Sequence, residues 1–266
     1  MRTLKLYLHS MGMLLRAHTQ YRASFALQTL AQLVMEGGEM MAVLLVVNRF
    51  ERLGHWSGGN LLFFFGVMSL TFYLTEFLGR GVTGAFPSMV RSGQLDTLLV
   101  RPRGLMTQVL CAEIDPRRIG CLAVGLTALI LGSRASGIRW TLPKALALLE
   151  AVGLGTLLTL GLFLIECVLC VYTVRSIEMV NALTYGGRSA CQYPVDIYPR
   201  PLRILFTAVA PYALVLHVPA AWILDKPLWN WPAWTAFVTP LAGPLVFLVM
   251  RGAFGVAMRH YRSTGS

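Results

Sequence analysis

The groups in this chain best suited to chemistry are acidic side chains that lie inside long apolar runs. Burying a carboxylate in hydrocarbon is costly, so such residues usually face protein or a water-filled cavity and mark ion or substrate paths. Glu36 and Glu39 are three residues apart and share one face of a helix, with Gly37 and Gly38 between them. Further carboxylates of this kind are Glu76, Glu150 and Glu166.

Two interpretations of the Glu36 and Glu39 pair stay open. The pair is either an ion or proton site, or a polar contact between helices that the two glycines allow to approach closely. No Lys or Arg lies inside the apolar runs that clearly span a membrane, so the sequence favours the polar contact. We predict Glu36, Glu39 and Glu166 as the intramembrane polar positions.

Other chemistry has little support in the residue pattern. The chain contains neither a G-x-x-x-x-G-K-[ST] nucleotide loop nor an H-E-x-x-H metal motif. Cys167 and Cys170 form a C-x-x-C inside an apolar helix, where packing is the simpler interpretation than zinc or redox chemistry. We therefore expect no catalytic residue, cofactor or metal in this chain.

Composition sets the class of protein. Of 266 residues 56% are hydrophobic and 13% charged, and the mean hydropathy is +0.62. Such a chain is an all-α integral membrane protein with no room for a separate catalytic domain. The net charge of +11 is spread over many short loops, which fits lipid headgroups and membrane orientation and not nucleic acid.

Apolar runs of about 20 residues predict six crossings of a single membrane domain that covers the whole chain. A basic amphipathic helix over residues 1–22 is expected to lie in the interface before them. Five of the predicted spans are Phe25 to Val47, Leu61 to Leu78, Ile119 to Leu131, which is short unless part of Leu105 to Ile114 enters the bilayer, Ala145 to Val174, and Ala233 to Met250. The first is too long for a signal-peptide core and is expected to remain in the protein.

The fifth crossing is ambiguous. Residues 177–193 are helix-like but polar for a span, and residues 202–224 are more apolar but contain Pro211 and Pro219. Broken helices at membrane depth are tolerated where they are buried in protein or line a wet cavity. We therefore predict that the proline-rich region 194–230 is re-entrant and that only one of the two segments crosses fully.

Charge predicts the orientation. The N-terminal segment, the loop 79–118 and the C-terminal tail hold thirteen Lys and Arg, whereas the loops on the opposite side hold five. Since Lys and Arg resist translocation in short loops, both termini are expected in the cytoplasm.

A short charged segment interrupts the apolar runs at Val90 to Pro102. Leu95, Leu98 and Leu99 have helical spacing, and Gly93 and Pro102 are stop signals on either side. The segment is a candidate contact with a soluble partner. An ordinary polar loop is the alternative interpretation. The residues assigned to this contact are Arg91, Gly93, Leu95, Asp96, Leu98, Leu99, Arg101 and Pro102.

The pattern Gly-x-Leu-Asp-x-Leu-Leu-x-Arg-Pro resembles the loop after the second span in permease subunits of bacterial ABC-2 type exporters, where a coupling helix contacts the ATPase. The prolines at 194–211 and the basic tail Tyr-x-Ser-Thr-Gly at 261–265 resemble the same family. The resemblance implies a second permease subunit, identical or homologous, and two separate ATPase subunits that bind ATP and Mg²⁺. It also implies location in the bacterial cytoplasmic membrane.

The sequence therefore predicts a multi-pass permease that exports a hydrophobic or amphiphilic molecule. Two other functions are weighed against it. A proton-coupled secondary transporter would use Glu36 and Glu39 and favour an inverted repeat, which the sequence does not display. A polytopic membrane enzyme would favour a cluster of His, Asp or Cys at one membrane face, and none stands out.

Overall fold

The computed structural model describes residues 12–13, 22–50, 52–172 and 177–261. Apart from residues 12, 13 and 22, the predicted interfacial helix over 1–22 lies outside this part of the chain. The long helices are α2 (Arg22–Phe50), α3 (Gly58–Arg80), α7 (Ile119–Ala135), α8 (Leu142–Tyr172), α9 (Ile177–Cys191) and α13 (Ala242–His260). The short helices are α4 (Phe86–Arg91), α5 (Gln94–Leu99), α6 (Leu105–Leu110), α10 (Arg200–Ile204), α11 (Val218–Ile223) and α12 (Thr235–Val238).

The remaining elements are single turns and one very short hairpin. They are β1 (Arg52–Leu53), β2 (Trp56–Ser57), η1 (Gly81–Ala85), η2 (Pro116–Arg118), η3 (Val195–Ile197), η4 (Leu205–Val209), η5 (Ala213–His217) and η6 (Thr239–Leu241). The two strands pair antiparallel in the turn between α2 and α3 and are the sheet structure found in the described chain. The protein is an all-α integral membrane protein, as the composition predicts.

Five helical segments of the described chain are long and apolar enough to cross a membrane. These are Ala23–Val46, Gly58–Arg91, Pro116–Ala135, Leu142–Tyr172 and Thr235–His260. Each overlaps one of the five spans that the apolar runs predict. The third span is longer than predicted at both ends, since it begins with η2 at Pro116 and continues to Ala135, and the last extends to His260.

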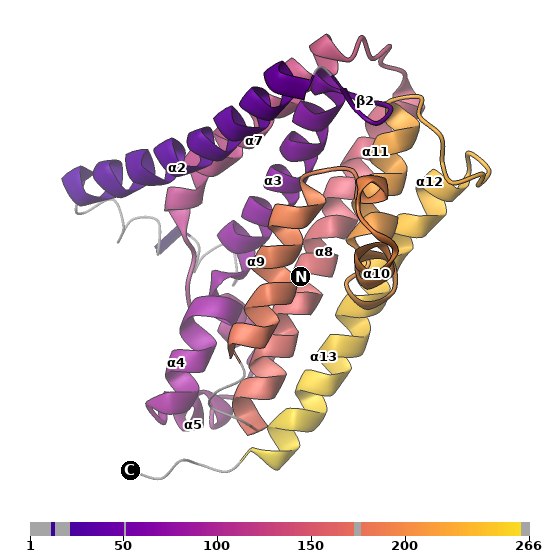
Figure 1. Ribbon diagram of the computed structural model, residues 1–266. Helices are drawn as coiled ribbons and strands as arrows, with labels where there is room; N and C mark the ends of the chain where they lie inside the picture. Colours follow the sequence, from indigo (N-terminus) through magenta and orange to yellow (C-terminus); the bar gives the residue numbers. More distant parts are fainter. Residues whose placement is uncertain (1–11, 14–21, 51, 173–176, 262–266) are drawn as a thin grey trace.

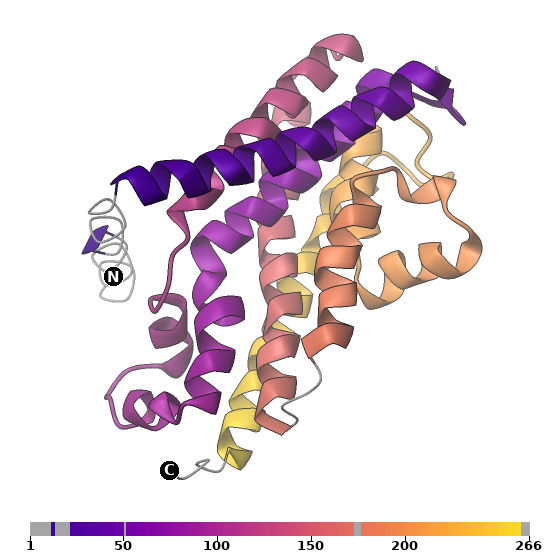
Figure 2. The same ribbon diagram turned by 60° about the vertical axis from the view of Figure 1, so that its left-hand side comes forward.

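The helices α8, α9 and α13 run side by side, and α3 packs between α8 and α7 (Figures 1 and 2). The helix α2 crosses this bundle obliquely and contacts α7 and α3. Much of its surface remains uncovered, and its exposed apolar side chains are Leu27, Leu30, Leu33, Val34, Met35, Met41 and Leu45. Exposed apolar side chains on membrane helices contact lipid or another subunit.

Glycines allow α3 and α7 to touch. A Cβ at Gly66 would lie 2.5 Å from the backbone nitrogen of Leu129, and one at Gly132 would collide with the backbone of Phe63. Membrane helices associate mainly through close packing, which small residues permit. This contact fixes the direction of α3, which carries the polar side chains described below.

The ambiguous region contains one straight helix and one bent pair. The helix α9 lies along α8 and α3, and its 15 residues span about 22 Å, less than the ~30 Å hydrocarbon core. The segments Arg200–Val209 and Ala213–Ile223 meet at 87° around Pro211. Of the two candidates for the fifth crossing, residues 202–224 are therefore not a straight span. Re-entrance of this pair stays a prediction, because a bent pair is also compatible with a broken span.

The second span does not end where the sequence places the loop. After Gly79 the chain continues through η1 into α4, so helix extends to Arg91 inside the predicted loop 79–118. The glycines at 79, 81 and 84 produce an irregular wide turn and not a stop, because helix resumes at Phe86. The helices α4 and α5 lie at the end of the bundle where α13 ends (Figure 1).

The opposite end is closed by contacts between the α2–α3 turn and the proline-rich region. The indole of Trp56 is fully buried and donates a hydrogen bond of 2.9 Å to Asp196. His55 Nε2 lies 3.2 Å from the same carboxylate. These contacts hold the chain before α10 against the start of α3.

Candidate functional site

The carboxylate of Glu36 lies at a junction of α2, α3 and α9. Arg188 of α9 approaches Glu36 Oε2 at 2.6 Å, while the hydroxyls of Tyr73 and Ser69 donate to the two carboxylate oxygens at 2.5 and 2.7 Å. Glu36 and Arg188 are 2% and 6% exposed. A buried charge needs a partner and hydrogen bonds to offset its desolvation, and Glu36 has both.

Glu39 lies one turn further along α2 and has a different environment. Its Oε2 is 2.8 Å from the same guanidinium, but its side chain is 45% exposed. Arg188 also lies over the rings of Tyr73 and Phe72, with its Cζ 4.8 and 5.4 Å from their centroids. One arginine thus joins two carboxylates, one enclosed in protein and one on the uncovered side of α2.

The sequence did not anticipate the cation of this site. No Lys or Arg lies inside the five clearly apolar spans, but Arg188 belongs to the segment whose topology was ambiguous and supplies the cation from there. A signal was present, since the polar residues Asn181, Thr184, Arg188 and Gln192 recur every three or four positions and form one stripe on a helix.

The glycines beside the pair do not act as predicted within one chain. A Cβ at Gly37 or at Gly38 would meet no atom within 4 Å. The close approach expected there is therefore absent from the described chain, and the surface at these glycines is free for contact with lipid or another subunit.

A second buried network centres on Glu76, one helical turn from Tyr73 on α3. Glu76 is fully buried, accepts a hydrogen bond of 2.7 Å from the Tyr185 hydroxyl, and lies 2.8 Å from Arg118 Nε. Arg80 lies 3.6 Å away from it. The cation of Arg118 is also 5.6 Å from the Tyr73 ring centroid, so it touches the first network.

This second network extends to η2, at the start of α7. Arg118 and Arg117 lie 3.4 and 2.5 Å from the carboxylate of Asp115. Burial by itself raises the pKa of Asp115, but the Arg117 hydrogen bond and the nearby guanidinium charges lower it below its ordinary value. Arg117 and Arg118 in turn donate to the amides of Gln28 and Gln32 on α2 at 2.7 and 2.9 Å.

The two networks follow one stripe along α3. Ser69, Tyr73 and Glu76 have the i, i+4, i+7 spacing of a single helix face, and Tyr185 and Arg188 of α9 face them three residues apart. The result is a polar seam that links α2, α3 and α9 inside an otherwise apolar bundle. Sequence reasoning found Glu76 but not its partners Tyr185 and Arg118.

The third intramembrane position, Glu166, belongs to neither network. It is 5% exposed on α8 next to Cys167, whose thiol donates to the carbonyl of Val82 at 3.2 Å. Cys167 and Cys170 are buried in the apolar core and are not joined in a disulfide. Within the described residues no group of three His, Cys, Asp or Glu side chains is placed to hold a metal ion.

A short helix is present where the leucine spacing predicts one. It is α5, which begins after Gly93 in a left-handed conformation with φ of 71°. Glycine reaches this conformation without the steric cost that other residues meet. Leu95 is fully buried, Leu98 is partly buried, and Leu99 and Val100 are 45% and 86% exposed.

The leucine face of α5, formed by Leu95, Leu98 and Leu99, is therefore divided between two roles. Leu95 packs into the protein's own core beside Val90 and Val109, so its predicted insertion into a partner is wrong for this arrangement. Arg91, Arg101 and Pro102 remain exposed. Leu98, Arg101 and Pro102 also border a hollow of about 580 Å³ beside α6. Gln108 closes the turn by donating to the carbonyls of Leu98 and Arg103.

The fold, the buried polar seam and the exposed helix α5 define a multi-pass membrane protein with a prominent short helix at one end. A family profile described as ABC-2 family transporter protein matches residues 33–265. The chain belongs to the ABC-2 transporter family and is a membrane component of an ABC transporter, a part that is not itself catalytic. Membership implies association with an ATPase subunit. Searches of curated proteins and of solved structures found no match.

Proposed function

We propose that this chain is the permease subunit of an ATP-driven exporter in a bacterial cytoplasmic membrane. Two permease subunits, identical or homologous, assemble with two separate ATPase chains that carry ATP and Mg²⁺. The cargo is a hydrophobic or amphiphilic molecule. Family membership supports the ABC transporter part of this proposal, and the exposed end of α5 supports the ATPase contact.

The single observation that carries the coupling role is the exposure of Leu99 and Val100 at the tip of a helix anchored by Leu95. Large apolar side chains at 45% and 86% exposure on a short charged hairpin are costly to leave in water. The anchored side of α5 would transmit movement of the partner into α4 and α3. Domain movements of this kind are rigid-body shifts between discrete packings.

The uncovered face of α2 is the proposed seam between the two permease subunits. It carries seven exposed apolar side chains together with half-exposed Glu39 and the open glycines at 37 and 38. Small residues and a polar group on one helix face favour helix association in membranes. Cargo would pass along this seam, where Glu39 supplies a polar contact and Arg188 holds it in place.

The test is co-purification followed by reconstitution. A tagged chain should retain an ATPase subunit from its native membrane, and Val100→Asp should abolish that retention, whereas the isosteric Val100→Thr should retain most of it. Both variants should insert and stay folded, because the side chain contacts water. If Val100→Asp retains as much ATPase as the wild type, α5 is not the contact with the ATPase. Export that requires a proton gradient but no ATPase would instead support a secondary transporter.

A further inference from the structure

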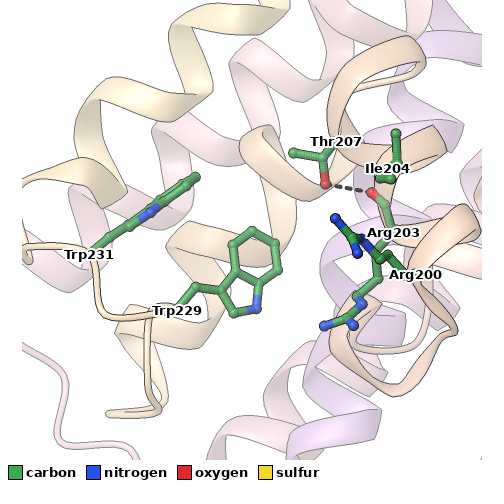
Figure 3. A pocket seen from close by; sticks show the side chains of 6 residues that line it. All are labelled: Arg200, Arg203, Ile204, Thr207, Trp229 and Trp231. Atoms are coloured by element: carbon green, nitrogen blue, oxygen red, sulfur yellow. Dashed lines mark hydrogen bonds between the residues drawn. The ribbon is translucent and has the colours of Figure 1, made fainter.

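A pocket of about 460 Å³ lies between α10 and the loop that follows α11, far from the α5 end of the bundle (Figures 1 and 3). Its six lining residues are Arg200, Arg203, Ile204, Thr207, Trp229 and Trp231. Figure 3 shows the two guanidinium groups on one side and the two indoles on the other. Its volume is in the range of small-molecule sites.

The positive side of the pocket is not neutralised. Arg200 and Arg203 are three residues apart on α10, both are exposed, and no ion pair joins either to a residue in the described part of the chain. The nearby carboxylates are engaged elsewhere, since Asp196 contacts Trp56 and His55, and Asp225 contacts Lys144 at 2.7 Å. Two free guanidinium groups on one face favour a phosphate or carboxylate.

The apolar side is held rigidly. Trp229 stacks on His217 with ring centroids 5.1 Å apart and an interplanar angle of 20°. His217 is 4% exposed, stacks on Phe64 at 5.3 Å, and its Nδ1 accepts the backbone N–H of Val195 at 3.3 Å. Trp231 meets Trp229 edge to face at 5.5 Å.

The backbone of the loop is also constrained. Trp229 and Asn230 have φ of 50° and 63°, a region that residues other than glycine rarely adopt. Such conformations persist only where surrounding contacts fix them, and they cluster at ligand sites. The stacking of Trp229 on His217 and its edge-to-face contact with Trp231 are two such contacts.

Arg and Trp side chains are also common at membrane interfaces, where they contact lipid without forming a site. Here the indole of Trp229 is fixed against a buried histidine instead of lying freely in the interface, and this leaves a hollow between it and the arginines. A preformed hollow with one charged wall and one apolar wall matches a single amphiphile better than a general lipid surface.

We propose that this pocket binds an anionic amphiphile with a phosphate headgroup. The headgroup lies between Arg200 and Arg203, and the first part of the chain lies along Trp229 and Trp231. Such a molecule could be a bilayer phospholipid or the exported cargo, and the shared chemistry is a phosphate on an alkyl chain. The proposal concerns binding alone and does not depend on the ATPase contact.

The test is a titration of the full-length chain in dodecyl maltoside with dodecyl phosphate, followed by native mass spectrometry. We expect Arg200→Gln combined with Arg203→Gln to weaken binding at least tenfold, since each guanidinium supplies a charge-assisted hydrogen bond. The matched control is Arg134→Gln with Arg139→Gln, two exposed arginines near the same end of the bundle, which should bind like the wild type. Trp231→Ala should weaken the binding of dodecyl phosphate. The variant should stay folded, because Trp231 is 40% exposed.

The source of the natural ligand is distinguished by extracting the chain purified from its native membrane. If the wild-type chain retains phosphatidylglycerol and the double Arg200 and Arg203 variant does not, the natural ligand is a bilayer lipid. If the wild-type chain instead retains an amphiphile that is not a phospholipid, and the double variant loses it, the natural ligand is cargo. Equal affinity of the double variant and the wild type for dodecyl phosphate would overturn the proposal. So would an equal loss in the control variant, or binding of inorganic phosphate as tight as that of dodecyl phosphate.

Discussion

Arg188 on α9 reaches the carboxylate of Glu36 on α2 at 2.6 Å, although the two residues lie 152 positions apart in the sequence. Both side chains are buried, and the same guanidinium contacts Glu39 at 2.8 Å. The helix α2 is thus tied to α9, the helix before the proline-rich region, by one charged group. If α2 and α9 move relative to each other, the ion pair between Glu36 and Arg188 has to break. If the ion pair stays intact, the two helices have to move together.

Replacing Arg188 by Met should strongly destabilise the protein. Removing one partner of a buried ion pair typically costs about 3 to 5 kcal/mol because the other charge stays buried without compensation. Glu36 would be that charge. The melting temperature of the purified variant in detergent should fall, while Glu39→Gln, which alters a half-exposed carboxylate, should change it little.

Neutralising both carboxylates tests the same pair from the other side. Glu36→Gln with Glu39→Gln leaves Arg188 as an unpaired buried cation, so this double variant should also be less stable. Adding Arg188→Met should recover stability, because fully neutral replacements of buried ion pairs are often tolerated. If the triple variant is no more stable than the double variant, the pairing does not account for the loss. If the wild type transports its cargo with a proton gradient and the Glu39→Gln variant does not, Glu39 is part of a proton site.

The two ends of α5 should respond differently to mutation. Leu95→Ala should lower stability by about 2 to 5 kcal/mol, the usual cost of a cavity at a fully buried leucine. Leu99→Ala should leave the melting temperature unchanged and weaken retention of the ATPase. The measurements are thermal unfolding and co-purification on the same samples. A stability loss for Leu99→Ala equal to that for Leu95→Ala would contradict the division of the leucine face.

The spans were predictable because each is a long apolar run, and hydrophobicity alone identifies such a run. The helix α5 was predictable from Gly93 and the leucine spacing, but the burial of Leu95 was not, since a narrow apolar stripe does not reveal which residue faces the chain's own core. The cation for Glu36 was missed because it depends on how α9 lies against α2. That contact is between distant segments, and neither propensity nor periodicity of one segment reports it.

The Arg and Trp pocket illustrates the same limit. Trp229, Trp231 and Trp234 precede the last apolar run, and a tryptophan cluster in that position is typical of a membrane interface. The fixed orientation of Trp229 and Trp231 depends on His217 and on the left-handed backbone at Trp229 and Asn230, which follow from tertiary packing.

The glycine contact between α3 and α7 should be intolerant of even one methyl group. Gly66→Ala would place a Cβ 2.5 Å from the Leu129 nitrogen, so the two backbones must separate and the melting temperature should fall. Gly153→Ala is the matched control, because Gly153 lies in the middle of α8 with no atom within 4 Å of an added Cβ. Alanine exceeds glycine in helix propensity by about 1 kcal/mol, so the control should be neutral or stabilising. Equal destabilisation by both changes would mean that the α3–α7 distance is not the cause.

The orientation of the bundle is testable with single cysteines in a background without the five native ones. Trp56, in the turn between α2 and α3, is fully buried and cannot report access. Exposed Arg139, in the turn between α7 and α8, is therefore the external site, and exposed Thr97 on α5 is the internal one. The bias of thirteen positive residues against five predicts that a membrane-impermeant maleimide labels Arg139→Cys in intact cells and labels Thr97→Cys only after lysis. Arg259→Cys, at the end of α13, should behave like Thr97→Cys because both sites lie at the same end of the bundle (Figure 1). Labelling of Thr97→Cys from outside would invert the topology, place α5 away from any cytoplasmic ATPase, and remove the physical basis for its coupling role.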